Sequence, residues 1–261
     1  MSIFFRQQKI VAALVSILVC CSESGIQSHS TDVPKNPQEH QKQKPTTDDQ
    51  DKHPDSGAQE SNESEKQDLN WTPLFDGKST AGWEGIEFGG EGEFAVRDGM
   101  LHVGAGDPLT GFSSTRQDIP KSNYEVSLEA RKMDGIDFFC GLTFPVKDSH
   151  CTFIVGGWGG STVGLSCIDD VDASSNETGV IWDAKFNKNQ WYKIRVRILD
   201  QKIVAWIDDR KAVDVDITNK KISLRGDTTL CTPLGVCTFE TSSDIRNFKI
   251  RSLKTNPNQQ K

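Results

Sequence analysis

The sequence lacks three features that would place it in large classes of protein. No apolar run is long enough to span a bilayer: Ile10–Val19, apolar except for Ser16, has about ten residues, roughly half of what a membrane-spanning helix needs. No segment of helical length carries an apolar stripe with the 3.6-residue period. No nucleotide, flavin or haem motif is present, so the sequence indicates none of these cofactors.

The N-terminus reads as an export signal. Arg6 and Lys9 precede the apolar run, which has the length of a signal-peptide core. The following Leu18-Val19-Cys20-Cys21-Ser22 resembles a lipobox, in which a cysteine is lipidated and becomes the mature N-terminus. We therefore predict a signal peptide over residues 1–21 and an exported lipoprotein anchored through Cys21, in the periplasm or at the cell surface. The alternative is ordinary cleavage after Ser22-Glu23-Ser24, which would give a secreted protein.

Apolar residues are also scarce from Ser22 to Asn70. Only Ile26, Val33, Ala58 and Leu69 are apolar there, too few to offset the entropy of ordering the backbone. The segment carries eleven acidic side chains against five lysines, and it supplies much of the net charge of −7. We predict a disordered polar linker over 22–70, one folded domain over 71–256, and no nucleic acid as a partner.

The remaining sequence alternates with the two-residue period of strands. Its segments are short and are separated by turn signals such as Asp98-Gly99 and Asp208-Asp209. The expected strands are Glu93–Val96, Met100–Val103, Tyr124–Ala130, Ile136–Phe144, Cys151–Gly157, Thr162–Ile168, Trp191–Ile198, Ile203–Ile207, Lys211–Val215, Lys221–Arg225, Leu234–Phe239 and Ile245–Ile250. This pattern predicts an all-β jelly-roll sandwich.

Motifs at both ends of this domain resemble a known family. They are Leu74-Phe75-Asp76-Gly77-Lys78, Gly82-Trp83, Asp98-Gly99-Met100-Leu101, Asn189-Gln190-Trp191-Tyr192-Lys193-Ile194 and the closing Asp244–Leu253. In order and spacing they are similar to the 3-keto-disaccharide hydrolase domain, which is common in planctomycete and Bacteroidetes lipoproteins. The resemblance covers about residues 71–253. It implies a concanavalin A-like, laminin G-like jelly roll, a carbohydrate ligand and hydrolase activity.

The middle of the domain departs from the family pattern. Typical members carry Asn-Ser-Gly in the central strand, where this chain has Asp137–Leu142, and a Glu-apolar-Gln stretch on the next strand, where it has Cys151–Gly157. The resemblance therefore carries the fold over but not the catalytic activity. Five cysteines lie in the domain, at spacings that match no zinc site. They are either buried free thiols or include one disulfide that involves Cys231 or Cys237.

Candidate site residues are those placed on the sheet face opposite the core. Alternation in 136–144 predicts Asp137 and Phe139 on that face, with Ile136 and Phe138 in the core. Trp158 is set among four glycines, which leave its indole free to stack on a sugar. Further candidates for ligand binding are Trp182, Arg116 and Arg246, and for acid–base chemistry Asp137, His150 and Glu177.

Three functions remain open at this point. The first is an enzyme acting on glycosides oxidised at carbon 3, with Asp137 or Glu177 as base and His150 as acid. The second is a lectin-like carbohydrate-binding module whose platform is Trp158, Phe139 and Trp182. The third is a surface adhesion module. The loop from Ile168 to Thr178 is rich in oxygen ligands and makes Ca²⁺ a weakly supported cofactor, because the loop lacks the EF-hand glycine.

Overall fold

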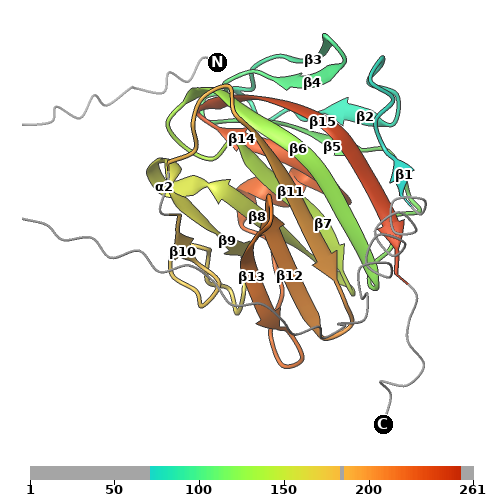
Figure 1. Ribbon diagram of the computed structural model, residues 1–261, viewed down its shortest axis with the longest axis vertical. Helices are drawn as coiled ribbons and strands as arrows, with labels where there is room; N and C mark the ends of the chain where they lie inside the picture. The colour runs from blue at the N-terminus through green and yellow to red at the C-terminus, as the bar shows by residue number, and fades with distance from the viewer. Residues whose placement is uncertain (1–70, 183–184, 254–261) are drawn as a thin grey trace, which may run out of the picture. The chain divides into compact units, whose positions relative to one another are not determined.

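The structure of the chain, a computed structural model, describes residues 71–182 and 185–253 (Figure 1). Within these residues the fold is a sandwich of two antiparallel sheets, so the predicted all-β jelly roll is confirmed. In this described part, no helix is long and apolar enough to cross a membrane. The predicted signal peptide, the lipidated Cys21 and the linker over 22–70 lie outside the described residues and stay predictions.

The first sheet, sheet A, contains the long strands labelled β6, β11 and β15 in Figure 1. Its order is β13 (Arg210–Asp216), β12 (Lys202–Ile207), β11 (Trp191–Ile198), β6 (Tyr124–Gly135), β15 (Thr241–Ser252), β4 (Met100–Val103) and β3 (Phe94–Arg97), with β1 (Thr72–Pro73) also paired to β15. Strand β15 lies between β6 and β4, so the end of the domain is held beside its beginning.

The second sheet, sheet B, carries the candidate site. Its order is β10 (Val180–Ile181), β9 (Thr162–Ser166), β8 (Ser149–Gly156), β7 (Cys140–Val146), β14 (Gly235–Phe239), β5 (Leu109–Ser114) and β2 (Trp83–Gly85). A short turn labelled α2 (Gly157–Gly160) follows β8, and a 3₁₀ segment, η1 (Gly226–Cys231), packs on the face of sheet B that points away from sheet A. These two connections frame the outer face of the sheet.

The main core lies between the two sheets, and the predicted alternation accounts for it. In β11, Tyr192, Ile194, Val196 and Ile198 are buried in it, while the charged residues between them face outward. In β8, Phe153 and its neighbours two residues away fill the same core. All five cysteines of the described residues are buried free thiols, so the alternative of a disulfide is not what the structure contains.

The predicted strand Ile136–Phe144 is wrong in its first four residues. Strand β7 begins only at Cys140, because the chain bends after Gly135, which has a φ of +108°. The bend reverses the expected faces: Phe139 is fully buried in the core, and Phe138 faces the opposite side of sheet B. The predicted strand Lys221–Arg225 is also wrong, since it forms only an isolated bridge at Ile222.

Candidate functional site

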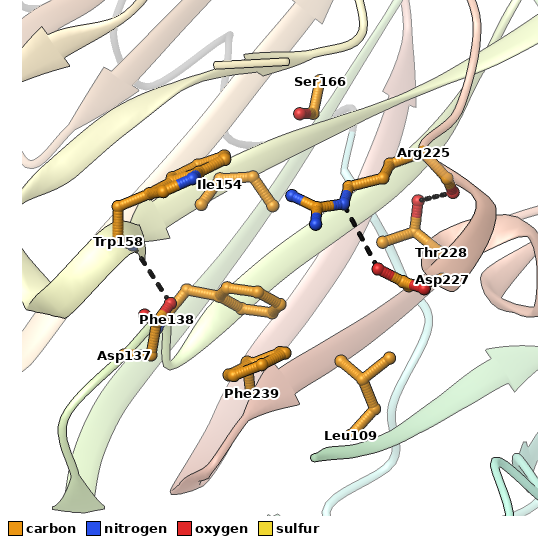
Figure 2. A pocket seen from close by; sticks show the side chains of 10 residues that line it. All are labelled: Leu109, Asp137, Phe138, Ile154, Trp158, Ser166, Arg225, Asp227, Thr228 and Phe239. Carbon is orange, nitrogen blue, oxygen red and sulfur yellow. Dashed lines mark hydrogen bonds and ion pairs between the residues drawn. The ribbon is translucent and has the colours of Figure 1, made fainter. Parts of the chain in front are cut away.

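A pocket of about 240 Å³ lies on the outer face of sheet B (Figure 2). Its lining comes from several segments that are far apart in the sequence: Leu109, Asp137, Phe138, Ile154, Trp158, Ser166, Arg225, Asp227, Thr228 and Phe239. Ile154 is out of phase with Phe153 and Val155, which belong to the core between the sheets. The pocket is therefore a feature of the solvent-facing side of the sheet.

One side of the pocket is apolar. Leu109 of β5 belongs to a small apolar cluster on this face, and Phe138 and Phe239 pack against it. The Phe138 and Phe239 rings have centroids 6.0 Å apart at an angle of 43°. Ile154 of β8 adjoins them. Such a floor, with a few polar groups around it, is typical of small-molecule sites.

The turn that carries Trp158 is held by Asp137. The Asp137 carboxylate accepts hydrogen bonds from the backbone amides of Phe138 (2.8 Å), Trp158 (3.2 Å) and Gly159 (2.9 Å). Trp158 itself has left-handed backbone angles, φ 50° and ψ 57°, and its side chain is 38% exposed. The sequence-predicted pair therefore meets at one pocket, with Asp137 as the residue that positions Trp158.

The glycines around Trp158 have a steric reason. A Cβ on Gly157 would lie 2.8 Å from the Ile154 side chain, closer than real Cβ contacts allow. Gly156 has a φ of +82°, in the region that L side chains rarely adopt. The turn can therefore fold against β8 only with glycine at these positions, and that fold places the indole at the pocket (Figure 2).

The other side of the pocket is polar and charged. The Arg225 Nε lies 3.2 Å from an Asp227 carboxylate oxygen, and both side chains are about half exposed. A second carboxylate, that of Asp172, lies 3.6 Å from Nη1 of Arg225. The Thr228 hydroxyl donates to the Arg225 carbonyl at 3.0 Å, which ties η1 to the preceding segment. An ion pair thus faces the apolar floor across the pocket (Figure 2).

Sequence reasoning missed Arg225 and Asp227. Ile222 and Leu224 alternate with polar residues, so the pattern predicts a strand that ends at Arg225. The signal that could have found them is Gly226 between an arginine and an aspartate, which breaks a strand and starts a turn.

Two of the predicted aromatic residues are not at the pocket. Phe139 is in the core, with its ring centroid 5.2 Å from that of Phe186. Trp182 is 9% exposed and stacks on the same Phe186 at 6.1 Å, and the Arg210 guanidinium covers it at 4.0 Å. Of the predicted platform, only Trp158 lines the pocket, since the other two rings are needed for packing.

The predicted acid and the second predicted base also lie elsewhere. His150 is in β8 but does not line the pocket, and partial burial lowers its pKa from the ordinary value. Glu177 forms an ion pair with Lys220 at 3.1 Å and lines a separate groove beside β13. Neither residue faces Trp158 or Arg225 across the pocket.

The two predicted arginines have other partners. Arg116 forms an ion pair with Asp118 at 2.7 Å, near the surface. Arg246 is on sheet A, where it forms an ion pair with Glu129 at 2.8 Å and covers the Trp191 ring at 3.9 Å. Neither lines the sheet B pocket.

The acidic loop considered for Ca²⁺ is neutralised by basic side chains. Asp169 lies 3.3 Å from Lys220, and Asp170 lies 2.7 Å from Lys221. The hydrogen bond from the Lys221 backbone amide lowers the pKa of Asp169, and the Lys221 side chain lowers that of Asp170. Across residues 71–182 and 185–253, no group of three or more histidine, cysteine, aspartate or glutamate side chains is placed to hold a metal ion.

Comparison with protein families gives a match over most of the domain. The family described as a 3-keto-alpha-glucoside-1,2-lyase-like domain matches residues 70–251. The match agrees with the resemblance found in the terminal motifs. A search of curated proteins gave no match.

Comparison with solved structures gives distant similarities. A candidate glycosyl hydrolase from Parabacteroides distasonis is 15% identical, with 73% of this chain and 97% of that chain covered and a TM-score of 0.45. The carbohydrate-binding module CBM66 from Bacillus subtilis is 12% identical (68% and 99% covered, TM-score 0.43). The Ca²⁺/Man3GlcNAc-bound domain of VIP36 is 10% identical (69% and 87% covered, TM-score 0.45). At these identities we carry no residue role over to this chain.

Proposed function

Because the chain belongs to the family of 3-keto-alpha-glucoside-1,2-lyase-like domains, we propose that its sheet B pocket binds a glycoside. The observation that carries the proposal is the opposition of two surfaces across one pocket. Phe138, Phe239 and Trp158 form the apolar surface, and the Arg225–Asp227 ion pair forms the polar one. A sugar ring has the matching division into C–H faces and hydroxyl edges.

Each surface has a separate task in this proposal. The indole of Trp158 stacks on a face of the sugar ring, since aromatic rings bury apolar area in a specific geometry. Arg225 donates to sugar oxygens and Asp227 accepts from sugar hydroxyls, as charge-assisted hydrogen bonds stronger than neutral ones. Asp137 does not touch the sugar in this arrangement. It keeps the Trp158 turn in place through the three backbone amides that it accepts from.

Cleavage of a 3-keto-glycoside is a second candidate function, and the Arg225–Asp227 pair favours it. A ketone at carbon 3 acidifies the hydrogen on carbon 2. Asp227 takes that proton, the released electron pair forms the double bond between carbons 1 and 2, and the carbon 1–oxygen bond breaks. Solvent water protonates the departing oxygen. Arg225 faces the negative charge that develops on the carbon 3 oxygen.

Asp227 fits the role of base better than the residues predicted for it. The carboxylate of Asp137 already accepts three amide hydrogen bonds, so its lone pairs are engaged by the turn. The carboxylate of Asp227 lies in the pocket, about half exposed, with the arginine as its ion-pair partner. In this scheme Asp227 is the catalytic residue and Asp137 is a positioning residue.

The test uses the full chain with α-linked disaccharides and their 3-keto forms. Calorimetry measures binding, and chromatography of the products measures turnover. We expect Arg225→Ala to weaken binding at least about tenfold, since a hydrogen bond to a charged group is worth about 1.5–3 kcal/mol. Lys147→Gln, in the turn between β7 and β8, is the matched control and should bind like the wild type. Equal binding by Arg225→Ala and the wild type would place the sugar elsewhere.

Turnover distinguishes the two functions. If the pocket cleaves 3-keto-glycosides, Asp227→Asn should lower kcat about 10²–10⁴-fold while the sugar still binds. If the wild type binds these sugars without cleaving them, the pocket has the lectin-like function. If the wild type shows no binding and no turnover with any of these sugars, the proposal is refuted and an adhesion module is favoured.

A further inference from the structure

A groove on the outer face of sheet A is a second candidate site. It has a volume of about 410 Å³. Strands β6, β11 and β15, which run side by side in Figure 1, line it together with the 73–77 segment and Gly99. The family motifs Phe75-Asp76-Gly77 and Arg246-Asn247-Phe248 both border it. It lies on the sheet opposite the pocket described above, so its chemistry is separate.

Strand register places cations in adjacent rows across this groove. Lys193, Glu129 and Arg246 form one row across β11, β6 and β15. Arg195, Ser127 and Lys249 form the next row in the same order of strands. The second row has a cation on either side of a hydroxyl and no carboxylate within it.

A bulge in β15 opens the groove. The register between β15 and β6 shifts between Arg246 and Lys249, and Asn247 has a φ of +53°. Such a bulge bends its strand and redirects side chains. Asn247 and Arg246 then each donate to a different carboxylate oxygen of Glu129, at 2.9 and 2.8 Å. Burial opposes the ionisation of Glu129, but these hydrogen bonds outweigh it and hold its pKa below the ordinary value.

The carboxylates at the groove are already engaged, while two cations are not. Glu129 is matched by Arg246, and Asp76 accepts hydrogen bonds from Lys78 and Ser79 within its own turn. Within the described ranges, neither Lys193 nor Lys249 has a carboxylate within ion-pair distance. Lys249 instead lies 5.1 Å from the Trp71 ring. Positive charge is therefore left over at the groove of a chain whose net charge is −7.

Ser127 gives an independent sign of a ligand. Its side chain is 2% exposed, it lines the groove, and its hydroxyl has no hydrogen-bond partner among the residues that the structure describes. Among the described residues, the Ser127 Oγ is not one of the fully buried side-chain oxygens left without a partner, so it is open to the groove and can donate to an anion bound there. The arrangement of Lys193, Ser127 and Lys249 thus offers three donors to one negatively charged group.

From this geometry we propose that the sheet A groove binds the carboxylate or sulfate group of an anionic polysaccharide. Lys193, Lys249 and the Ser127 hydroxyl all line the groove and suit a single anionic group. Nucleic acid is disfavoured, because its binding rests on many phosphate contacts in a row and the groove offers two lysines for such contacts. The site is independent of the glycoside pocket and needs neither Trp158 nor Arg225.

The test measures binding of the full chain by calorimetry with four probes. Polygalacturonate supplies carboxylates, dextran sulfate supplies sulfate esters, and neutral dextran and a DNA duplex are the controls. We expect one or both anionic polysaccharides to bind, more weakly as salt is added, and neutral dextran not to bind. Binding of polygalacturonate but not dextran sulfate would identify a uronate as the ligand. Binding of dextran sulfate but not polygalacturonate would identify a sulfate ester.

Variants assign the binding to the groove. The double variant Lys193→Gln/Lys249→Gln should lose at least about tenfold in affinity, and Ser127→Ala about two- to tenfold. Lys147→Gln removes one lysine charge outside the groove, in the turn between β7 and β8, and should bind as the wild type does. Arg225→Ala, which tests the glycoside pocket, should also leave this affinity unchanged. Wild-type affinity in the double variant, neutral dextran binding that the double variant loses, or DNA binding of equal strength would overturn the proposal.

Discussion

Replacing Trp158 tests whether this residue serves the pocket or the core. Full truncation of a buried tryptophan to alanine costs about 3–5 kcal/mol. Trp158 is 38% exposed, so about three-fifths of the residue is buried. Scaled by that fraction, Trp158→Ala should lower the free energy of unfolding by about 2–3 kcal/mol. The indole therefore contributes to stability, but less than a core tryptophan does.

The left-handed backbone at Trp158 adds a second, opposite expectation. A residue with a Cβ is disfavoured by about 1–2 kcal/mol in this conformation, and glycine is not. The φ of 50° at Trp158 should therefore make Trp158→Gly at least as stable as Trp158→Ala, although glycine is more flexible when unfolded. Glycine is normally the more destabilising of the two substitutions, so the order of the pair reports the backbone of the turn.

Urea denaturation of the full chain measures both differences. Trp182→Ala is the matched control, because Trp182 is 9% exposed and should lose about 3–5 kcal/mol. A loss of more than about 4 kcal/mol for Trp158→Ala would make Trp158 a core residue and remove it from the site. A glycine variant clearly less stable than the alanine variant would refute the left-handed turn.

Three further predictions concern pH, thiol reactivity and the N-terminus. Burial alone would raise the pKa of Glu125, but hydrogen bonds from the arginines around it outweigh burial and lower the pKa. The contribution of Glu125 to stability is therefore present above about pH 4.5 and is lost as the pH falls through the lower folded-state pKa. The wild type should exceed Glu125→Gln in stability near pH 7, and a difference that does not shrink in acid would contradict this. Burial raises the pKa of the Cys140 and Cys151 thiols, so Ellman's reagent should react with them only after unfolding, and rapid reaction with the native protein would show that they are accessible. Mass spectrometry should find a diacylated or triacylated Cys21 at the mature N-terminus, whereas an unmodified terminus at Gly25 would mean a secreted protein.

Sequence patterns were most informative where the two-residue period was regular. The alternation of Tyr192, Ile194 and Val196 in β11 predicted both a strand and the face that is buried. The four glycines around Trp158 predicted a presented indole, because they leave no side chains beside it in the sequence. In both cases the local sequence carries the physical cause of the structure.

The pocket was less predictable, because its lining depends on bends and long-range contacts. The bend after Gly135 exchanged the faces of Phe138 and Phe139, and no local signal in 136–139 marks where β7 begins. Arg225 and Asp227 reach the pocket only because η1 packs over sheet B, which brings together residues distant in sequence. Periodicity reports the face of a strand, but it does not report which loops cover that face.

The central claim is that the sheet B pocket takes a glycoside between Trp158 and the Arg225–Asp227 pair. Calorimetry with 3-keto-disaccharides on the wild type, Arg225→Ala and the Lys147→Gln control tests it most directly. The account predicts sugar binding by the wild type and the control, and at least about a tenfold loss of affinity in Arg225→Ala. Equal affinity in all three proteins would contradict it.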